Sequence, residues 1–364
     1  MKTRNNSLTS QALQKFKKNT TGVLSFWFIV ICGFIAVFAY LIAPDNSSNA
    51  NQMHLEIHSK KPGFEVLMLT IPSKVEASQS FINKIIAGKI NPQNEIPISK
   101  FNISENTLII FPYTANGIES ISKTYPLSSF KAKDISEYIK TKTFYLGTDK
   151  YGRDLLSRML IGTRISFFIG FIAVFISLVI GISIGAIAGY YGGKIDALIM
   201  WIINITWSIP TLLLVIAITL ALGKGFWQVF IAVGLTMWVE VARVVRGQIM
   251  STKQMQYVEA AKALGFSNFR IIFRHILPNI MAPVIVISAA NFAGAILIES
   301  GLSFLGIGAQ PPTPSWGAMI KDHYSYIILG KAYLAIIPGL AIMSLVMAFM
   351  LIGNALRDAL DVKG

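Results

Sequence analysis

The sequence predicts an all-α polytopic membrane protein with six transmembrane helices and a small α+β domain inserted on the outer side of the membrane. Three observations predict this class. Of the 364 residues, 53% are hydrophobic and only 14% are charged, a composition too apolar for an ordinary soluble domain. Six runs are apolar enough to cross a bilayer, and a long polar stretch separates the first two. Basic residues are concentrated on one side of these predicted spans.

The first apolar run, residues 23–43, has 21 residues without a charge. At about 1.5 Å per residue it crosses a hydrocarbon core of roughly 30 Å. A cleaved signal peptide has a shorter apolar region followed by small residues, so this run is predicted to stay as an anchor. Residues 1–22, the polar and basic segment before this run, are expected in the cytoplasm. Cys32, the single cysteine, lies within the run, which excludes an intrachain disulfide and indicates a packing role.

Residues 44–143 form a predicted outer insert, and residues 144–364 a core that holds the other five spans. The stretch from residue 44 to residue 164 carries fifteen basic and eleven acidic residues and no run of spanning length. Its size suits a small domain. Alternating and strand-forming residues predict strands at 54–58, 65–71, 101–103 and 107–111, and Asp134 with Glu137 indicates a short capped helix.

The remaining predicted spans are residues 165–193, 197–223, 226–246, 280–298 and 332–356. Gly181 and Gly185 in the first of these allow a neighbouring helix to approach closely. Pro210 lies near the middle of the next span and is expected to kink it. Asn204, Ser208 and Pro210 are therefore candidates for lining a conduit. The alternative is that the polar side chains only satisfy backbone groups left unpaired at the kink.

The segment between the fourth and fifth spans, residues 247–279, is long and polar. Good helix formers predict a helix over 257–264, which Gly265 is expected to end. Ser267 is expected to cap a second helix, which Pro278 ends before the next span. Its predicted apolar stripe consists of Phe269, Ile272, Phe273 and Ile276. The two helices form either a compact knob that fits a groove on another protein or an amphipathic loop that lies on lipid headgroups.

The distribution of basic residues predicts the orientation in the membrane. With the N-terminus in the cytoplasm, the inner segments hold fourteen Lys and Arg residues, whereas the short outer loops hold three. The inner set is Lys2, Arg4, Lys15, Lys17, Lys18, Lys194, Arg243, Arg246, Lys253, Lys262, Arg270, Arg274, Arg357 and Lys363, and the outer set is Lys224, Lys321 and Lys331. This bias places both termini and residues 247–279 in the cytoplasm. The formal charge of +14 thus reflects membrane topology rather than nucleic-acid binding.

No energy source or catalytic constellation is visible in the sequence. None of the Gly-Lys pairs is followed by Ser or Thr, so a phosphate-binding loop is absent. The carboxylates Asp196, Glu240 and Glu299 lie near predicted span ends rather than in mid-membrane. Glu240 has Arg243 and Arg246 at helical spacing, which indicates a local ion pair.

The histidines offer no metal site either. His54 and His58 would share a helix face, but the predicted strand places them roughly 13 Å apart at about 3.3 Å per residue. We therefore expect no metal and no cofactor in this chain, and an energy source on a partner.

Three motifs resemble one family of membrane proteins. Residues 259–278 contain Glu-Ala-Ala, three residues, Gly, nine residues, then His-Ile-Leu-Pro. This is similar to the cytoplasmic coupling loop of permease subunits in binding-protein-dependent ATP-binding-cassette importers, with His275 in place of the usual Ile. Residues 146–158, LGTDKYGRDLLSR, and the Gly- and Pro-rich segment 299–317, which we expect to dip back among the helices, resemble the dipeptide, oligopeptide and nickel branch.

The resemblance implies a type I importer permease fold in a bacterial inner membrane. It also implies an assembly with a second permease, two ATPase subunits that hold ATP and Mg²⁺, and an extracytoplasmic substrate-binding protein. The residues it implies for ATPase coupling are Glu259, Ala260, Ala261, Gly265, His275, Leu277 and Pro278.

The cargo stays open between peptides and nickel. A rival of another class is a membrane-anchored receptor or enzyme whose activity lies in residues 44–143, and an exporter or secondary transporter is a further alternative.

Overall fold

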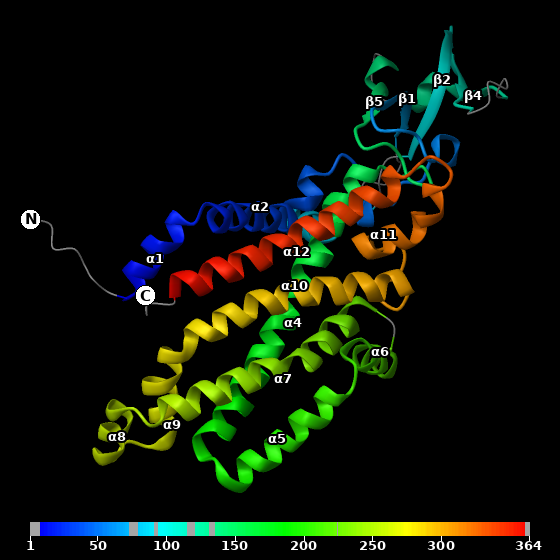
Figure 1. Ribbon diagram of the computed structural model, residues 1–364. Coiled ribbons are helices and arrows are strands. Elements are labelled where there is room, and N and C mark those ends of the chain that lie inside the picture. Colours follow the sequence, from blue (N-terminus) through cyan, green and yellow to red (C-terminus); the bar gives the residue numbers. More distant parts are fainter. Residues whose placement is uncertain are drawn as a thin grey trace, which may run out of the picture. The chain divides into compact units, whose positions relative to one another are not determined.

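The computed structural model describes residues 8–72, 79–90, 94–114, 121–130, 135–223 and 225–360 (Figure 1). The chain divides into two compact units, each described here by itself. Unit 1 comprises Met1–Gly33, Ser166–Gln310 and Gly339–Gly364, and unit 2 comprises Phe34–Ile165 and Pro311–Pro338.

Within the described residues, five helical stretches are long and apolar enough to cross a membrane, or six if one bent pair counts as a single span. The α-helices, inside and outside these stretches, are α1 (Leu8–Lys18), α2 (Thr20–Ile42), α3 (Phe81–Ala87), α4 (Leu155–Tyr191), α5 (Gly193–Ser208), α6 (Thr211–Leu222), α7 (Phe226–Thr252), α8 (Gln256–Ala263), α9 (Asn268–Arg270), α10 (Met281–Leu305), α11 (Trp316–His323) and α12 (Tyr333–Leu360). The predicted fold class, a helical polytopic membrane protein with a small sheet-containing insert, is confirmed.

The third predicted span is broken rather than kinked. α5 and α6 meet at 93° across Ile209 and Pro210. Proline has no N–H to donate and clashes with the preceding turn, so the helix stops at Ser208 and restarts after Pro210. The Ser208 hydroxyl donates to the Ile205 carbonyl at 2.7 Å, which satisfies one of the freed carbonyls.

Small residues bring α4 and α7 into close contact, as the glycine pattern predicted. A Cβ added at Gly181 would lie 2.5 Å from the Cβ of Val241, and one added at Gly185 would lie 2.5 Å from the carbonyl oxygen of Ala242. Real side chains do not approach that closely, so the two helices can pack at this distance only where α4 has glycine.

The fifth span extends further than predicted, because α10 continues to Leu305. Glu299 is therefore inside the helix, with only 1% of its surface exposed, and it accepts a hydrogen bond from Ser303 at 2.7 Å. The predicted start of the outer segment at residue 299 was wrong, because residues 299–305 continue the helix and Glu299 lies six residues before its end.

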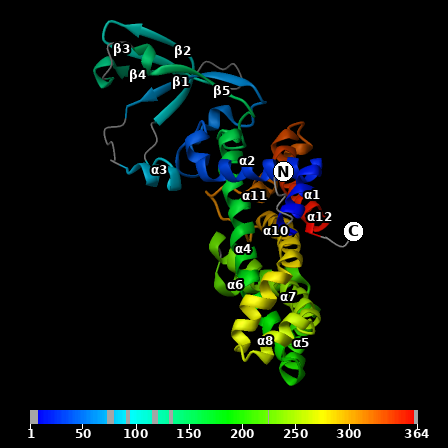
Figure 2. The same ribbon diagram turned by 90° about the vertical axis from the view of Figure 1, so that its left-hand side faces the viewer.

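Unit 2 contains one five-stranded antiparallel sheet with the order β4-β3-β2-β1-β5 (Figure 2). Its strands are β1 (Phe64–Ile71), β2 (Asn94–Ser104), β3 (Thr107–Pro112), β4 (Lys123–Pro126) and β5 (Ile139–Phe144). Leu69, Ile98, Leu108 and Ile110 form its core. The predicted strands at 65–71, 101–103 and 107–111 are confirmed, the last two as a hairpin in which Ser104 pairs with Thr107.

The strand predicted at 54–58 was wrong, since Leu55–Ile57 form a single 3₁₀ turn. The alternation of apolar side chains there reflects one buried residue, Ile57, rather than a sheet face. The short helix near Glu137 is a 3₁₀ turn, Ile135–Glu137, and Asp134 lies outside the described residues.

Residues 146–154 form a largely buried polar turn, and residues 155–158 begin α4. Asp149 is fully buried and accepts hydrogen bonds from the Arg153 side chain at 2.6 Å and from two backbone N–H groups. Lys150 binds Asp322 at 3.0 Å. A buried carboxylate is stable only when paired in this way, so the motif fixes the turn that leads into α4.

His323, on α11, gives unit 2 a dependence on pH. Its Nδ1 lies 2.7 Å from the Met319 carbonyl oxygen, and the backbone N–H of Lys150 donates to Nε2 at 3.4 Å. A neutral ring satisfies both contacts, whereas a protonated ring cannot accept at Nε2. Burial lowers the pKa of His323 below its usual 6.5, although Asp149 and Asp322 favour the charged form.

We expect the melting temperature of the full chain to fall as the pH is lowered through about 6.5, because the unfolded state then binds a proton before the folded state does. His323→Gln should reduce this fall, measured by thermal unfolding between about pH 7 and about pH 5.5. Burial also lowers the pKa of His54, so the variant should keep a smaller dependence of its melting temperature on pH. The same slope in the variant and the parent chain would contradict the assignment.

Candidate coupling site and transmembrane cavity

The segment between α7 and α10 begins with α8, whose two faces differ. Val258 and Ala261 are buried, whereas Glu259 and Ala260 are exposed. Small alanines allow this short helix to lie close to the rest of the unit, and the Glu259 carboxylate points away from the buried side. α8 therefore presents a charged and small-residue face outward.

Gly265 ends α8, as predicted. Its φ of +77° is in the left-handed region, which glycine adopts without a Cβ penalty. Its N–H donates to the Lys262 carbonyl at 2.9 Å, and the N–H of Phe266 reaches the Ala261 carbonyl at 3.2 Å. These two bonds satisfy carbonyls at the helix end and reverse the chain direction.

The second helix begins as predicted, with the Ser267 hydroxyl accepting a bond from the Arg270 N–H at 3.4 Å. The predicted end at Pro278 was wrong. α9 passes into a wider π-type turn, Ile271–Ile276, then a 3₁₀ turn, Leu277–Ile280, and directly into α10. Proline is tolerated there because it occupies the first turn of the new segment, where its missing N–H has no helical partner to lose.

The predicted apolar stripe is only half buried. Ile272 and Ile276 are buried together with Ile271, whereas Phe269 is 70% exposed and Phe273 is 49% exposed. Phe269 and Phe273 instead pack on each other at the surface, with ring centroids 4.3 Å apart.

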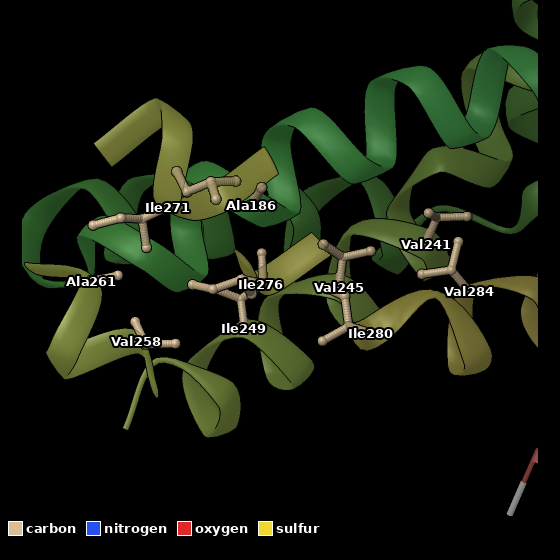
Figure 3. Packing of buried hydrophobic residues seen from close by; sticks show 11 residues of the cluster. Ala186, Val241, Val245, Ile249, Val258, Ala261, Ile271, Ile276, Ile280 and Val284 are labelled. Atoms are coloured by element: carbon tan, nitrogen blue, oxygen red, sulfur yellow. The ribbon is translucent and has the colours of Figure 1, made fainter. Parts of the chain in front are cut away.

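A single apolar cluster fastens this segment to three long helices (Figure 3). Val258 and Ala261 come from α8, and Ile249 and Val245 from α7. The whole cluster is Ala186, Val241, Val245, Ile249, Val258, Ala261, Ile271, Ile272, Ile276, Ile280 and Val284, with Leu277 packed against it. Because the interior is close-packed, a force applied to α8 is transmitted to α4, α7 and α10 rather than absorbed within the loop.

Polar bonds tie the same segment to the end of α4. The Tyr190 hydroxyl donates to the Asn268 side chain at 2.8 Å, and Lys253 donates to the Tyr190 carbonyl at 3.3 Å. Asn279 donates to the Tyr257 hydroxyl at 3.2 Å and so links the two ends of the segment. Figure 1 shows α8 and α9 beside the C-terminal end of α7.

The predicted coupling residues fall into an exposed and a supporting group. Glu259, Ala260, Gly265 and Pro278 are exposed; Ala261 is buried and Leu277 half-buried in the cluster. The His275 ring stacks on Phe266 with centroids 5.6 Å apart and an interplanar angle of 12°. The same segment exposes three large apolar side chains, Leu264 (73% exposed), Phe269 and Phe273, of which the regular helical pattern had assigned the two phenylalanines to one apolar stripe with Ile272 and Ile276.

An ion pair with α5, rather than the predicted local pair, holds the C-terminal part of α7. Arg246 binds both carboxylate oxygens of Asp196 on α5, at 2.5 and 2.6 Å. The predicted pairing of Glu240 with its own helix was wrong, because the bidentate geometry with Asp196 is better than an i,i+3 contact. Arg243 instead lies over the Trp207 ring, 3.6 Å from its centroid, and donates to Asn204 at 3.3 Å.

A cavity of about 310 Å³ lies in unit 1 between α5, α6, α7 and α10. Its wall includes Thr206, Trp207, Ile209, Thr211, Leu214, Thr236, Met237, Val239, Glu240, Ala290, Asn291, Gly294 and Ile298. The break at Pro210 opens this space, because α6 turns away from the line of α5. Asn204, Ser208 and Pro210 lie beside the break but are not part of the wall.

Asn291 is the most distinctive group of the cavity wall. Only 2% of its surface is exposed, and its Nδ2 has no hydrogen-bond partner within the part of the chain that the structure describes. A buried amide without a partner is costly, so the group is suited to a ligand or water that enters the cavity. No spacing in the sequence distinguishes this asparagine from other polar residues of the spans.

Together, a multi-pass helical fold, a packed two-helix segment between two spans and a cavity lined by both polar and apolar residues are typical of a membrane transport subunit. Residues 181–363 match the family described as binding-protein-dependent transport system inner membrane component, and residues 7–62 match the N-terminal TM domain of oligopeptide transport permease C. The chain belongs to the family of binding-protein-dependent transport permeases. It is a multi-pass membrane protein and a transport subunit.

Several curated relatives match the same core. The chain is 42% identical to a glutathione transport system permease protein, GsiD, of Pectobacterium atrosepticum, over 60% of this chain and 72% of the relative. It is 43% identical to a dipeptide transport system permease protein, DppC, of Alkalihalophilus pseudofirmus, with the same coverage. DppC of Haemophilus influenzae is 44% identical over 60% of this chain and 74% of the relative. A solved structure of a methionine ABC transporter is 18% identical, covers 56% of this chain and has a TM-score of 0.47.

Proposed function

We propose that this chain is one of two permease subunits of an ATP-driven importer of peptides. The observation that carries the coupling role is the segment 256–280, in which exposed Glu259, Leu264 and Phe269 stand on a buried cluster shared with α4, α7 and α10. Support for peptide cargo comes from relatives named for dipeptide and glutathione transport. ATP and Mg²⁺ reside on the partner ATPase subunits.

In this proposal, closure of an ATPase pair on ATP moves a groove into which the exposed face of the segment fits. The movement reaches the spans because Ile271, Ile276 and Ile249 transmit it through one packed cluster. Coupling requires contacts that differ between the inward-open and outward-open states. The exposed apolar side chains of Leu264, Phe269 and Phe273 in the same segment supply surface that a groove on a partner protein can cover.

The orientation that follows from this role places both termini and residues 247–279 in the cytoplasm and the insert, residues 44–143, outside the cytoplasm. An extracytoplasmic substrate-binding protein delivers cargo on that side. The translocation path passes the break between α5 and α6, beside Asn204, Ser208 and Pro210, and includes the cavity wall with Asn291.

Asn291→Leu should weaken peptide uptake without preventing assembly. The substitution removes the free amide and keeps a similar volume, and one neutral hydrogen bond is worth about 0.5–1.5 kcal/mol. We therefore expect the apparent KM for uptake to rise several-fold at unchanged ATPase content of the complex. Thr219→Val is the matched control, since its buried hydroxyl also has no partner among the described residues but does not line the cavity. Equal KM values for the two variants would contradict a cargo contact at Asn291.

Purification of the chain from its own cells in mild detergent tests the assembly. The proposal predicts that a second permease and an ATPase copurify in fixed ratio with the parent chain. An intact chain that purifies alone, while its cells still import peptide through it, would overturn the proposal.

A further inference from the structure

The helix α3, in the insert, is exposed on every side. None of its seven residues is buried, yet Phe81, Ile82 and Ile86 are 67%, 64% and 59% exposed. At about 100° per residue, these three side chains and Ile85 lie on one continuous arc of the helix surface. Asn83 and Lys84 lie on the opposite side of the helix. α3 is thus an amphipathic helix whose apolar arc is left uncovered by the described residues of its own unit.

Two residues at the ends of spanning helices hold α3 in place. Arg164, on α4, donates to the carbonyl oxygens of Ile85 and Ile86 at 3.2 and 2.9 Å. A Cβ at Gly88, which follows α3, would lie 2.8 Å from the Tyr40 ring of α2, so this glycine packs flat against the tyrosine. The Arg164 guanidinium also lies over the Tyr40 ring, 5.0 Å from its centroid. In Figure 2, α3 lies apart from the sheet, beside the end of α2.

Tyr40 and Arg164 mark the level of the membrane surface. Tyr40 lies two residues before α2 ends at Ile42, and Arg164 is the last charged residue before the uncharged stretch that completes α4. Tyrosine rings and arginine side chains at the ends of spans are typical of the interface between hydrocarbon and water. The contacts of Arg164 and Tyr40 therefore hold α3 at this interface.

The charge and length of α3 favour lipid as the partner of its apolar arc. A seven-residue helix is unstable in water unless its apolar side is covered. Residues 79–90 carry Lys84 and Lys89 and no acidic residue, which suits a surface with anionic headgroups. Ile90, 63% exposed, extends the apolar arc beyond the helix.

We propose that α3 lies in the lipid interface, with Phe81, Ile82 and Ile86 buried among the acyl chains and Lys84 at the headgroups. The insert is then attached to the membrane in two ways. It is covalently linked to the spanning helices α2 and α4, and α3 contacts the lipid directly. The lipid contact restrains the segment between β1 and β2.

Site-directed spin labelling of the full chain in vesicles with anionic lipid tests this. Ile86→Cys is labelled in a Cys32→Ser background, and the collision rates of the label with oxygen and with a water-soluble nickel chelate are measured. Ile103→Cys is the matched control, because Ile103 is 54% exposed on β2, within the sheet. Phe81→Cys serves as a second site in case one label disturbs the helix.

Labels at 81 and 86 should collide more with oxygen and less with nickel than the label at 103, with a several-fold higher ratio of the two rates. A ratio equal to that at 103 would place α3 in water and overturn the proposal. Protection from both reagents would mean that protein covers the arc, which would also overturn it. Neither outcome bears on ATPase coupling through residues 256–280.

Discussion

Gly265→Pro is expected to leave the chain inserted in the membrane and to abolish transport. Proline fixes φ near −65°, whereas Gly265 needs +77° to turn the chain from α8 to α9. The substitution also removes the N–H that donates to the Lys262 carbonyl. The turn must rebuild, and α8 then loses its position on the cluster around Val258 and Ile271. Peptide uptake in cells with matched expression measures the effect.

Gly330 offers a matched control for this experiment. Its φ is +72°, its N–H donates to a helical carbonyl, that of Ile327, and no atom lies within 4 Å of its Cβ position, as at Gly265. Gly330→Pro imposes the same backbone conflict outside residues 256–280. The ATPase should therefore still copurify with this variant. Normal uptake by Gly265→Pro would show that the turn has no role in coupling.

Glu259→Lys should also abolish transport, because it reverses the only carboxylate on the exposed face of α8. Breaking a charge pair that is desolvated in a protein interface costs about 2–5 kcal/mol. Each 1.4 kcal/mol is tenfold in affinity, so ATPase docking should weaken by more than about tenfold. The amount of ATPase that copurifies with the chain, together with peptide uptake, measures this.

The same substitution separates the two interpretations of the segment. If residues 257–279 lay on lipid headgroups, an added lysine would strengthen that contact and leave transport intact. Glu105→Lys, in the exposed turn between β2 and β3, controls for the change in net charge. Full ATPase retention by Glu259→Lys would favour the lipid interpretation and refute docking through α8.

Local rules predicted much of the coupling segment correctly. The stop at Gly265 and the cap at Ser267 depend only on backbone geometry and one side-chain bond, so neighbouring residues suffice to predict them. The strands predicted at 101–103 and 107–111 likewise follow from strand-forming residues on either side of a short turn. These features need no knowledge of distant parts of the chain.

Features that depend on packing between distant elements could not be predicted in the same way. Phe269 and Phe273 are exposed while Ile272 and Ile276 are buried, although all four belong to the predicted stripe. Pro278 begins a turn where its position suggested an end. Arg246 pairs with Asp196, fifty residues away, in preference to Glu240 on its own helix. Asn291 belongs to the cavity wall because of how α5, α6, α7 and α10 meet, which no local pattern encodes.

The most direct test of the central claim is uptake of a labelled dipeptide into vesicles that contain the two permeases, with and without the ATPase subunits. With substrate-binding protein outside and ATP on the ATPase side, uptake should require the ATPases and should disappear in Gly265→Pro. Equal uptake by the permeases without any ATPase would contradict the account, since residues 256–280 would then have nothing to couple.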